Sequence, residues 1–203
     1  MKEKSGIVQT SKFDEFKSHL LLLSEDFDDQ LDEFVWTNGE PAVSQWVAAI
    51  LEQWEEIAKD LSRKQQNVLL WRIIGYPLFI GFWLQDNSKL DLPEKFLLLH
   101  AAKNVTLSLP QLFEPGEPME NGYYMWWDIL AKSNSRHEIA SICLDLLADL
   151  SLPQDPHVQV AALHGLGHLQ HPERPAVVDE FIRRHPEFKD EPWVLQCRNG
   201  TVL

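Results

Sequence analysis

Cysteine is scarce in this chain of 203 residues, and the scarcity bounds the class of protein. The two cysteines, Cys143 and Cys197, form no Cys-x-x-Cys pair and are too few for the disulfide framework of a small secreted domain. A reducing compartment is the simplest interpretation, with a single bridge between the two as the alternative. Residues 1–10 are polar and lack the apolar run of a signal peptide. We therefore expect a cytoplasmic protein.

A long apolar run is also missing. The most apolar stretch, residues 68–84, is interrupted by Arg72, Gly75, Pro77 and Gly81. It is shorter than the roughly 20 apolar residues that a helix needs to span a bilayer. We expect a buried helix or helix pair here, and no membrane partner.

Basic residues are few relative to acidic ones. The chain has 18 Lys and Arg against 31 Asp and Glu, a formal net charge of −13. This balance argues against a partner with a phosphate backbone, because nucleic-acid-binding proteins usually carry a basic surface. The excess is uneven, since residues 1–60 hold 14 acidic and 5 basic side chains and so account for −9 of it.

Apolar residues recur at steps of three or four along most of the chain, which is the spacing of one helical face. Ser11 is an expected N-cap, Asn38-Gly39 an expected helix stop, and Pro41 an expected first residue of the next helix. No segment alternates apolar and polar residues as a strand does. The sequence therefore predicts an all-α protein, an antiparallel array of eight or nine helices. The expected helical segments are residues 11–38, 41–61, 65–86, 92–101, 123–132, 136–150, 156–170, 176–185 and 192–198.

Residues 108–122 are the longest predicted loop and hold three prolines and two glycines. Long loops in compact proteins are usually functional or mark a boundary. We expect a single all-α domain over residues 1–203, with a candidate subdomain boundary in this loop.

Residues 136–198 resemble HEAT or armadillo-type helical repeats. The resemblance rests on a Leu-Pro turn at Leu152-Pro153, an Asp-Pro helix start at Asp155-Pro156, and a following apolar helix. Expected helix starts near residues 136, 156, 175 and 191 give a helix pair about every 40 residues, as in HEAT repeats. The resemblance implies a scaffold that binds partners through one face, and it carries no catalytic residues.

Three histidines near residue 168 are the sharpest chemical signal. His164 and His168 are four residues apart and His171 follows three later, so all three can share one helical face. Two histidines at this spacing can bind zinc, and a third ligand completes a catalytic type of site. The glutamate of the zinc-protease motif is absent, and Gly165 and Gly167 instead indicate close approach of another helix. The alternative is a helix whose imidazoles form hydrogen bonds or face solvent.

Carboxylates form a second pattern between residues 25 and 33, where no basic residue intervenes. The apolar residues of this segment share one face, so most of the carboxylates must face outward. The spacing lacks the ligand pattern and central glycine of a calcium-binding loop. The pattern indicates either a solvated helix face or a docking surface for a basic protein. The acidic residues are Glu25, Asp26, Asp28, Asp29, Asp32 and Glu33.

Aromatic residues form the third pattern, in a chain with eight tryptophans. Tyr123, Tyr124, Trp126 and Trp127 directly follow the 108–122 loop. Aromatic side chains beside a loop are typical of binding hot spots, but a helix entering the core explains them equally well.

The sequence contains no nucleophile elbow and no phosphate-binding glycine loop, so we predict no catalytic residues. Cys143 is expected in the core, and Cys197 is a minor candidate for a reactive thiol. The preferred hypothesis is a non-enzymatic scaffold without a cofactor, for example an acidic immunity or inhibitor protein that neutralises a basic toxin. The alternative is a metal-dependent hydrolase centred on His164, His168 and His171, with zinc as the candidate metal. A third is a helical-repeat enzyme with a basic groove around residues 183–189.

Overall fold

The computed structural model describes residues 4–22, 28–75, 78, 80–132 and 137–202, and within this part the chain forms helices and no strands. The all-α prediction is confirmed. The helices are α1 (Lys4–Leu21), α2 (Asp28–Asn38), α3 (Glu40–Glu52), α4 (Trp54–Lys59), α5 (Arg63–Ile74), α6 (Ile80–Trp83), α7 (Leu92–Leu107), α8 (Leu109–Leu112), α9 (Asn121–Lys132), α10 (His137–Leu150), α11 (Pro156–His168), α12 (Arg174–Arg184) and α13 (Pro192–Asn199), with a 3-10 turn at Pro186–Phe188.

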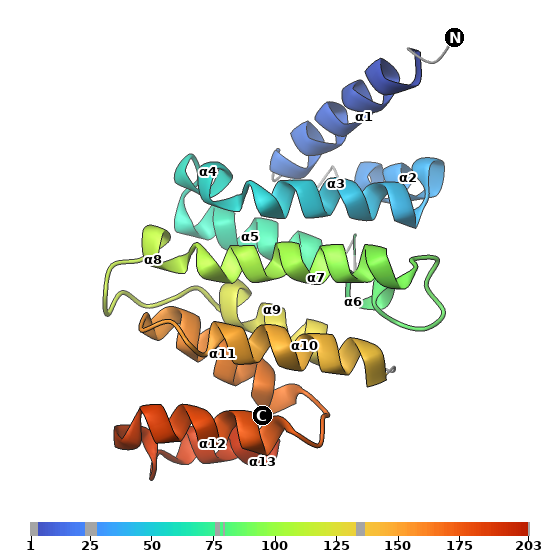
Figure 1. Cartoon of the computed structure of the whole chain (residues 1–203). Helices are drawn as coiled ribbons and strands as arrows, with labels where there is room; N and C mark the ends of the chain where they lie inside the picture. The colour runs from blue at the N-terminus through green and yellow to red at the C-terminus, as the bar shows by residue number, and fades with distance from the viewer. Residues whose placement is uncertain (1–3, 23–27, 76–77, 79, 133–136, 203) are drawn as a thin grey trace.

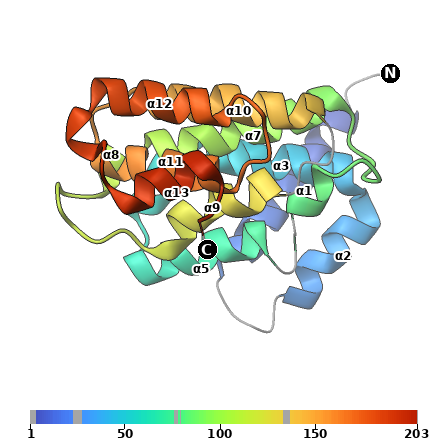
Figure 2. The same cartoon turned by 90° about the horizontal axis from the view of Figure 1, so that it is seen from below.

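The longer helices stack in two layers, which Figures 1 and 2 show from two directions. One layer contains α3, α7, α10 and α12, with α7 packed between α3 and α10. The other contains α5, α9, α11 and α13, in which α9 packs on α5 and α11, and α11 packs on α13. Helices α1 and α2 pack on α3 at the N-terminal end. The stack therefore follows the order of the sequence, and α9 and α11 lie at its centre.

The helix count exceeds the prediction because several expected segments are divided. Residues 11–38 were expected as one helix, whereas α1 begins at Lys4 and α2 begins at Asp28. Ser11 therefore lies inside α1, and its predicted role as an N-cap is wrong. Gly75 ends α5, as its lack of a side chain allows, and the short helices α4, α6 and α8 account for the remaining difference.

Several helix ends form where local chemistry predicts them. Gly39 has a positive φ of 83° between α2 and α3, so the predicted stop at Asn38-Gly39 is confirmed. Asp91 caps α7 in a reciprocal capping box with Glu94, and the Asp155 carboxylate accepts hydrogen bonds from the first amides of α11. The sequence also places Ser135 where a cap belongs, directly before the helix expected from residue 136, and Ser135 lies outside the described residues.

The segment after α8 is held against the helices on both sides. The guanidinium of Arg63 lies 4.1 Å from the centre of the Phe113 ring, and its Nε is 3.3 Å from a carboxylate oxygen of Glu117. His157 Nε2 is 2.8 Å from the carbonyl oxygen of Glu117. The core contains residues from both sides of this segment, which thus connects helices of one continuous core.

The described helices include none that is both long and apolar enough to cross a bilayer.

Gly165 is packed against two neighbouring helices, since a Cβ at this position would lie 2.7 Å from the Cβ of Trp127 and 2.8 Å from Cδ2 of Leu147. The close approach predicted from Gly165 is confirmed.

Candidate functional site

Two predicted histidines and an unpredicted aspartate form a cluster between α9 and α11. His164 and His168 are one turn apart on α11, and Asp128 lies on α9. One potential ligand atom from each residue lies within 4.8 Å of the other two. His168 Nδ1 and Asp128 Oδ1 are 3.5 Å apart, and the two imidazole rings are 4.8 Å apart at 69°.

The cluster is shielded from water. The side chains of His168 and Asp128 are 6% and 7% exposed, and His164 is also buried. The approach of α9 to α11 at Gly165 brings the aspartate and the histidines together, because Gly165 directly follows His164 and contacts Trp127, which directly precedes Asp128. Nitrogen and oxygen atoms in this arrangement can hold a divalent metal ion.

His171 does not belong to this cluster, and its prediction as the third ligand is corrected. It follows the end of α11, where the extended backbone of Leu169 turns the chain away. Its ring stacks on His137 at 5.4 Å, and its Nε2 is 3.3 Å from the Ser141 hydroxyl. The helical spacing that predicted three aligned histidines ends before residue 171.

The sequence contains a feature that singles out Asp128, although Asp128 lies outside the histidine pattern. It is the single acidic residue in α9, where its neighbours are mostly large apolar and aromatic residues. A carboxylate among such residues is costly to bury unless it is paired or binds a metal. Its partner lies on another helix, which the sequence does not reveal.

The aromatic cluster at the start of α9 belongs to the core. Tyr123, Trp126 and Trp127 are at most 2% exposed, so their predicted role in binding a partner is corrected. The Tyr123 hydroxyl donates a hydrogen bond to Gln66 Oε1 at 2.9 Å and accepts one from Trp54 Nε1 at 3.3 Å. Tyr124 is half-buried, with its ring 5.3 Å from that of His164.

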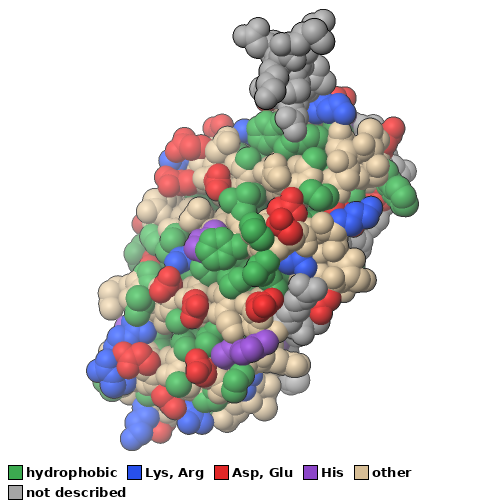
Figure 3. Space-filling view, turned by 45° about the vertical axis from the view of Figure 1, so that its right-hand side comes forward, with side chains coloured by type: hydrophobic (Ala, Val, Ile, Leu, Met, Phe, Trp, Pro, Cys, Tyr) green, Lys and Arg blue, Asp and Glu red, His purple; other side chains and the backbone are tan. Residues whose placement is uncertain are grey.

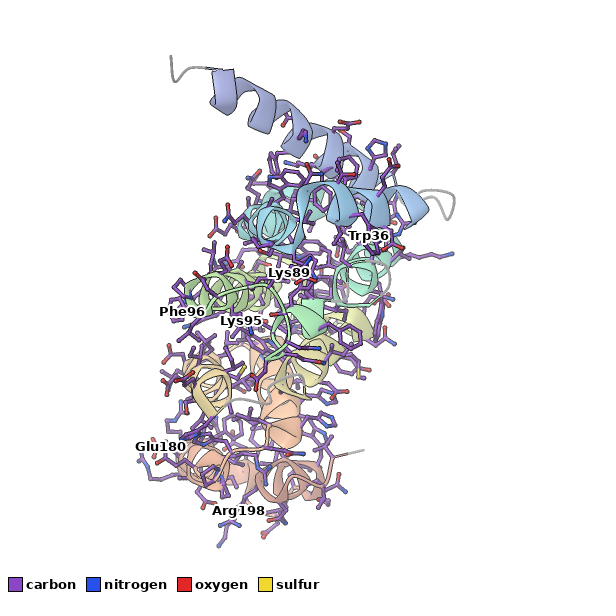
Figure 4. The ribbon with its side chains drawn as sticks, turned by 90° about the vertical axis from the view of Figure 1, so that its right-hand side faces the viewer. Trp36, Lys89, Lys95, Phe96, Glu180 and Arg198 are labelled. Atoms are coloured by element: carbon purple, nitrogen blue, oxygen red, sulfur yellow. The ribbon has the colours of Figure 1, made fainter. Side chains whose placement is uncertain are left out.

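The acidic pattern falls partly on described residues. Glu25 and Asp26 lie outside them, and Asp28 and Asp29 form the start of α2. Asp32 is half-buried and Glu33 is exposed. Sequence reasoning missed the neighbouring Trp36, which is 88% exposed near the end of α2 and is labelled in Figure 4.

Val35, which directly precedes Trp36 in the chain, lines a hollow of about 320 Å³ between α2 and α6. Val35, Leu78 and Phe82 contribute apolar side chains to this hollow, and Glu40 contributes a carboxylate. Phe82 is 58% exposed, and a Glu40 oxygen accepts a hydrogen bond from the backbone amide of Lys89 at 2.9 Å. The surface of α2 formed by Asp32, Glu33 and Trp36, together with the hollow at Val35, is called the Trp36 surface below.

The C-terminal end contains the two remaining candidate sites, the basic segment at residues 183–189 and the Cys197 thiol. Arg183 and Arg184 both approach the Glu180 carboxylate, at 2.6 and 3.5 Å, so this acid offsets the basic segment. Figure 3 shows Lys and Arg side chains gathered at this end, with acidic and hydrophobic side chains interspersed elsewhere on the face. Cys197 is buried, and burial raises the pKa of its thiol to about 12, which argues against a reactive thiolate.

Comparison with known proteins provides no relative. No protein-family model matches the chain, and neither the curated proteins nor the solved structures contain a significant match.

Proposed function

We propose that this protein binds a basic protein through the Trp36 surface and acts as a scaffold or inhibitor, with an immunity-type role as the concrete version. The observation that carries the proposal is the 88% exposure of Trp36. Tryptophan is among the residues that contribute most to binding energy in protein interfaces. A tryptophan held in solvent is therefore suited to burial by a partner.

Charge supports a basic partner. Asp32 and Glu33 precede Trp36 by four and three residues, so they adjoin it on the surface of α2. The whole helix contains four acidic residues and no basic one. An apolar anchor rimmed by carboxylates favours a partner with Lys or Arg around its own apolar contact, because complementary charge speeds association and selects the partner.

The alternative of a metal-dependent hydrolase has one observation in its favour, the cluster of Asp128, His164 and His168. A hydrolase also needs substrate to reach the metal. The Asp128 and His168 side chains are at most 7% exposed, and the hollow between α2 and α6 is lined by other residues. Protein binding is therefore the function that we propose.

The proposal is tested by affinity capture from the native host with immobilised variants and quantitative mass spectrometry. The first variant is Trp36→Ala, with Leu152→Ala as the matched control, since Leu152 is 54% exposed in the turn after α10. We expect a partner that the wild type and the control retain and that Trp36→Ala loses. An identical set of captured proteins for Trp36→Ala and the control would contradict the proposal.

Charge is tested with the purified partner. Reversing Asp28, Asp29 and Asp32 to Lys is expected to slow association at least about tenfold at low salt, and much less at high salt. The control reverses three exposed carboxylates elsewhere in the chain, at Asp60, Glu114 and Asp190. Equal association rates for the two triple variants would remove the role of the acidic helix.

A further inference from the structure

We propose that Asp128, His164 and His168 bind one divalent transition-metal ion, with zinc as the metal that best matches the ligands. This site is independent of the Trp36 surface. It rests on three side chains from two helices whose ligand atoms converge within 4.8 Å in the protein interior.

The distances fit a metal centre. Zinc binds imidazole nitrogen and carboxylate oxygen at about 2.0–2.2 Å, so two tetrahedral ligands lie about 3.4 Å apart. His168 Nδ1 and Asp128 Oδ1 are already 3.5 Å apart. The widest pair within the cluster is at most 4.8 Å apart, so metal binding requires that pair to close by up to about 1.4 Å.

The chemistry of the ligand set also selects a transition metal. Imidazole suits zinc, copper, nickel and iron, whereas magnesium and calcium prefer oxygen ligands. Two imidazoles and one carboxylate leave one tetrahedral position for water or another ligand. The Tyr124 ring of α9 packs edge-on against that of His164, with the ring centres 5.3 Å apart.

The metal would link the two central helices of one layer. Asp128 belongs to α9, and both histidines belong to α11. Because the bound ion stabilises only the folded arrangement of these helices, metal binding should raise the unfolding temperature in proportion to the logarithm of free metal concentration.

The experiment uses the full chain without a histidine tag, stripped with a chelator and titrated with Co²⁺ alone. We expect one Co²⁺ per chain, a visible absorption band from a tetrahedral site, and loss of that band when Zn²⁺ is added. No uptake of Co²⁺ or Zn²⁺ by the folded wild type would overturn the proposal.

Variants assign the ligands. His164→Gln and Asp128→Asn are expected to weaken Co²⁺ binding more than about 100-fold, because losing a ligand costs more than losing a residue that only supports one. His171→Gln is the matched control, since His171 is 8% exposed and His164 is 7% exposed. Unchanged binding by Asp128→Asn, or equal loss in His171→Gln, would refute the assignment.

A measurement on the wild type guards against variants that fail to fold. Nitrogen NMR of the imidazole rings should show Zn²⁺-dependent shifts for His164 and His168 and none for His157 or His171. Shifts at His171 without shifts at His164 would place the metal elsewhere and contradict the proposal.

Discussion

Gly165 of α11 and Trp127 of α9 are in such close contact that a Cβ at position 165 would lie 2.7 Å from the Cβ of Trp127. This contact sets the separation of the two central helices. It also places His164 and Asp128, the chain neighbours of these two residues, in one cluster. The lack of a side chain at Gly165 thus has a structural and a chemical consequence.

Gly165→Ala is expected to destabilise the fold by about 1–3 kcal/mol in denaturant unfolding, because the Trp127 Cβ cannot move without its helix. The helix-propensity gain of about 1 kcal/mol offsets only part of this cost. Gly167→Ala is the comparison variant, because a Cβ there would lie 2.5 Å from Cγ2 of Val202, a side chain beyond the last helix that can shift, and 3.4 Å from Cα of Cys197. We expect it to lose less stability than Gly165→Ala. Equal losses of stability would contradict this interpretation.

Tyr123→Phe removes a buried hydroxyl that joins three elements. The variant leaves Trp54 Nε1 without its acceptor and removes one of the donors to Gln66 Oε1. We expect a loss of about 1–3 kcal/mol in the free energy of unfolding, because a buried polar group loses its partner. Tyr124→Phe, on the adjacent half-buried ring, should cost clearly less. The comparison fails if the two variants are equally stable.

Thiol reactivity should report global unfolding only. Cys143 and Cys197 are both fully buried, and the Cys197 thiol has a pKa raised to about 12 by burial. At pH 8 such a thiol is ionised to a fraction on the order of 10⁻⁴, against about 0.2 for an ordinary cysteine. Ellman's reagent should therefore detect neither thiol in the native protein and both in denaturant. Rapid labelling of Cys197 under native conditions would show that α13 opens locally.

The Asp179–Arg198 ion pair, which joins α12 to α13, should make a small pH-dependent contribution. The guanidinium of Arg198 donates hydrogen bonds to both oxygens of Asp179, at 2.6 and 3.0 Å, and lowers the pKa of that carboxyl below 3.8. A lowered folded-state pKa contributes stability that is present above the unfolded value and is lost as pH falls through the folded value.

The variant Asp179→Asn tests the direction of this pH dependence. Above pH 4 the variant should be less stable than the wild type by about 0.5 kcal/mol, the scale of an exposed pair. The difference should shrink as the pH falls below 3.8. A difference that grows toward low pH would contradict the pKa direction.

Local signals in the sequence predicted much of the fold. Gly39, Pro41 and Asp155 mark helix ends through backbone freedom, a missing amide donor or a capping carboxylate, and these effects need only neighbouring residues. The start of α1 at Lys4 was missed because residues 4–10 lack a regular apolar face.

The candidate sites were less predictable because burial depends on the whole structure. Aromatic residues after a loop suit either an interface or a core, and only the packing of α9 on α5 and α11 places Trp126 and Trp127 inside. Trp36 also lies in a helix with apolar residues at helical spacing, yet it is exposed, because the described helices leave its side of α2 uncovered.

The sequence by itself determined the helical class, the main helix ends, the one-turn spacing of His164 and His168 and the acidic character of α2. These properties depend on residues within about one turn of each other. Only the tertiary structure decided that Asp128 joins the histidines and that His171 does not. The reason is physical: contact between α9 and α11 depends on how closely two surfaces pack, and residues far apart in the chain set that distance together.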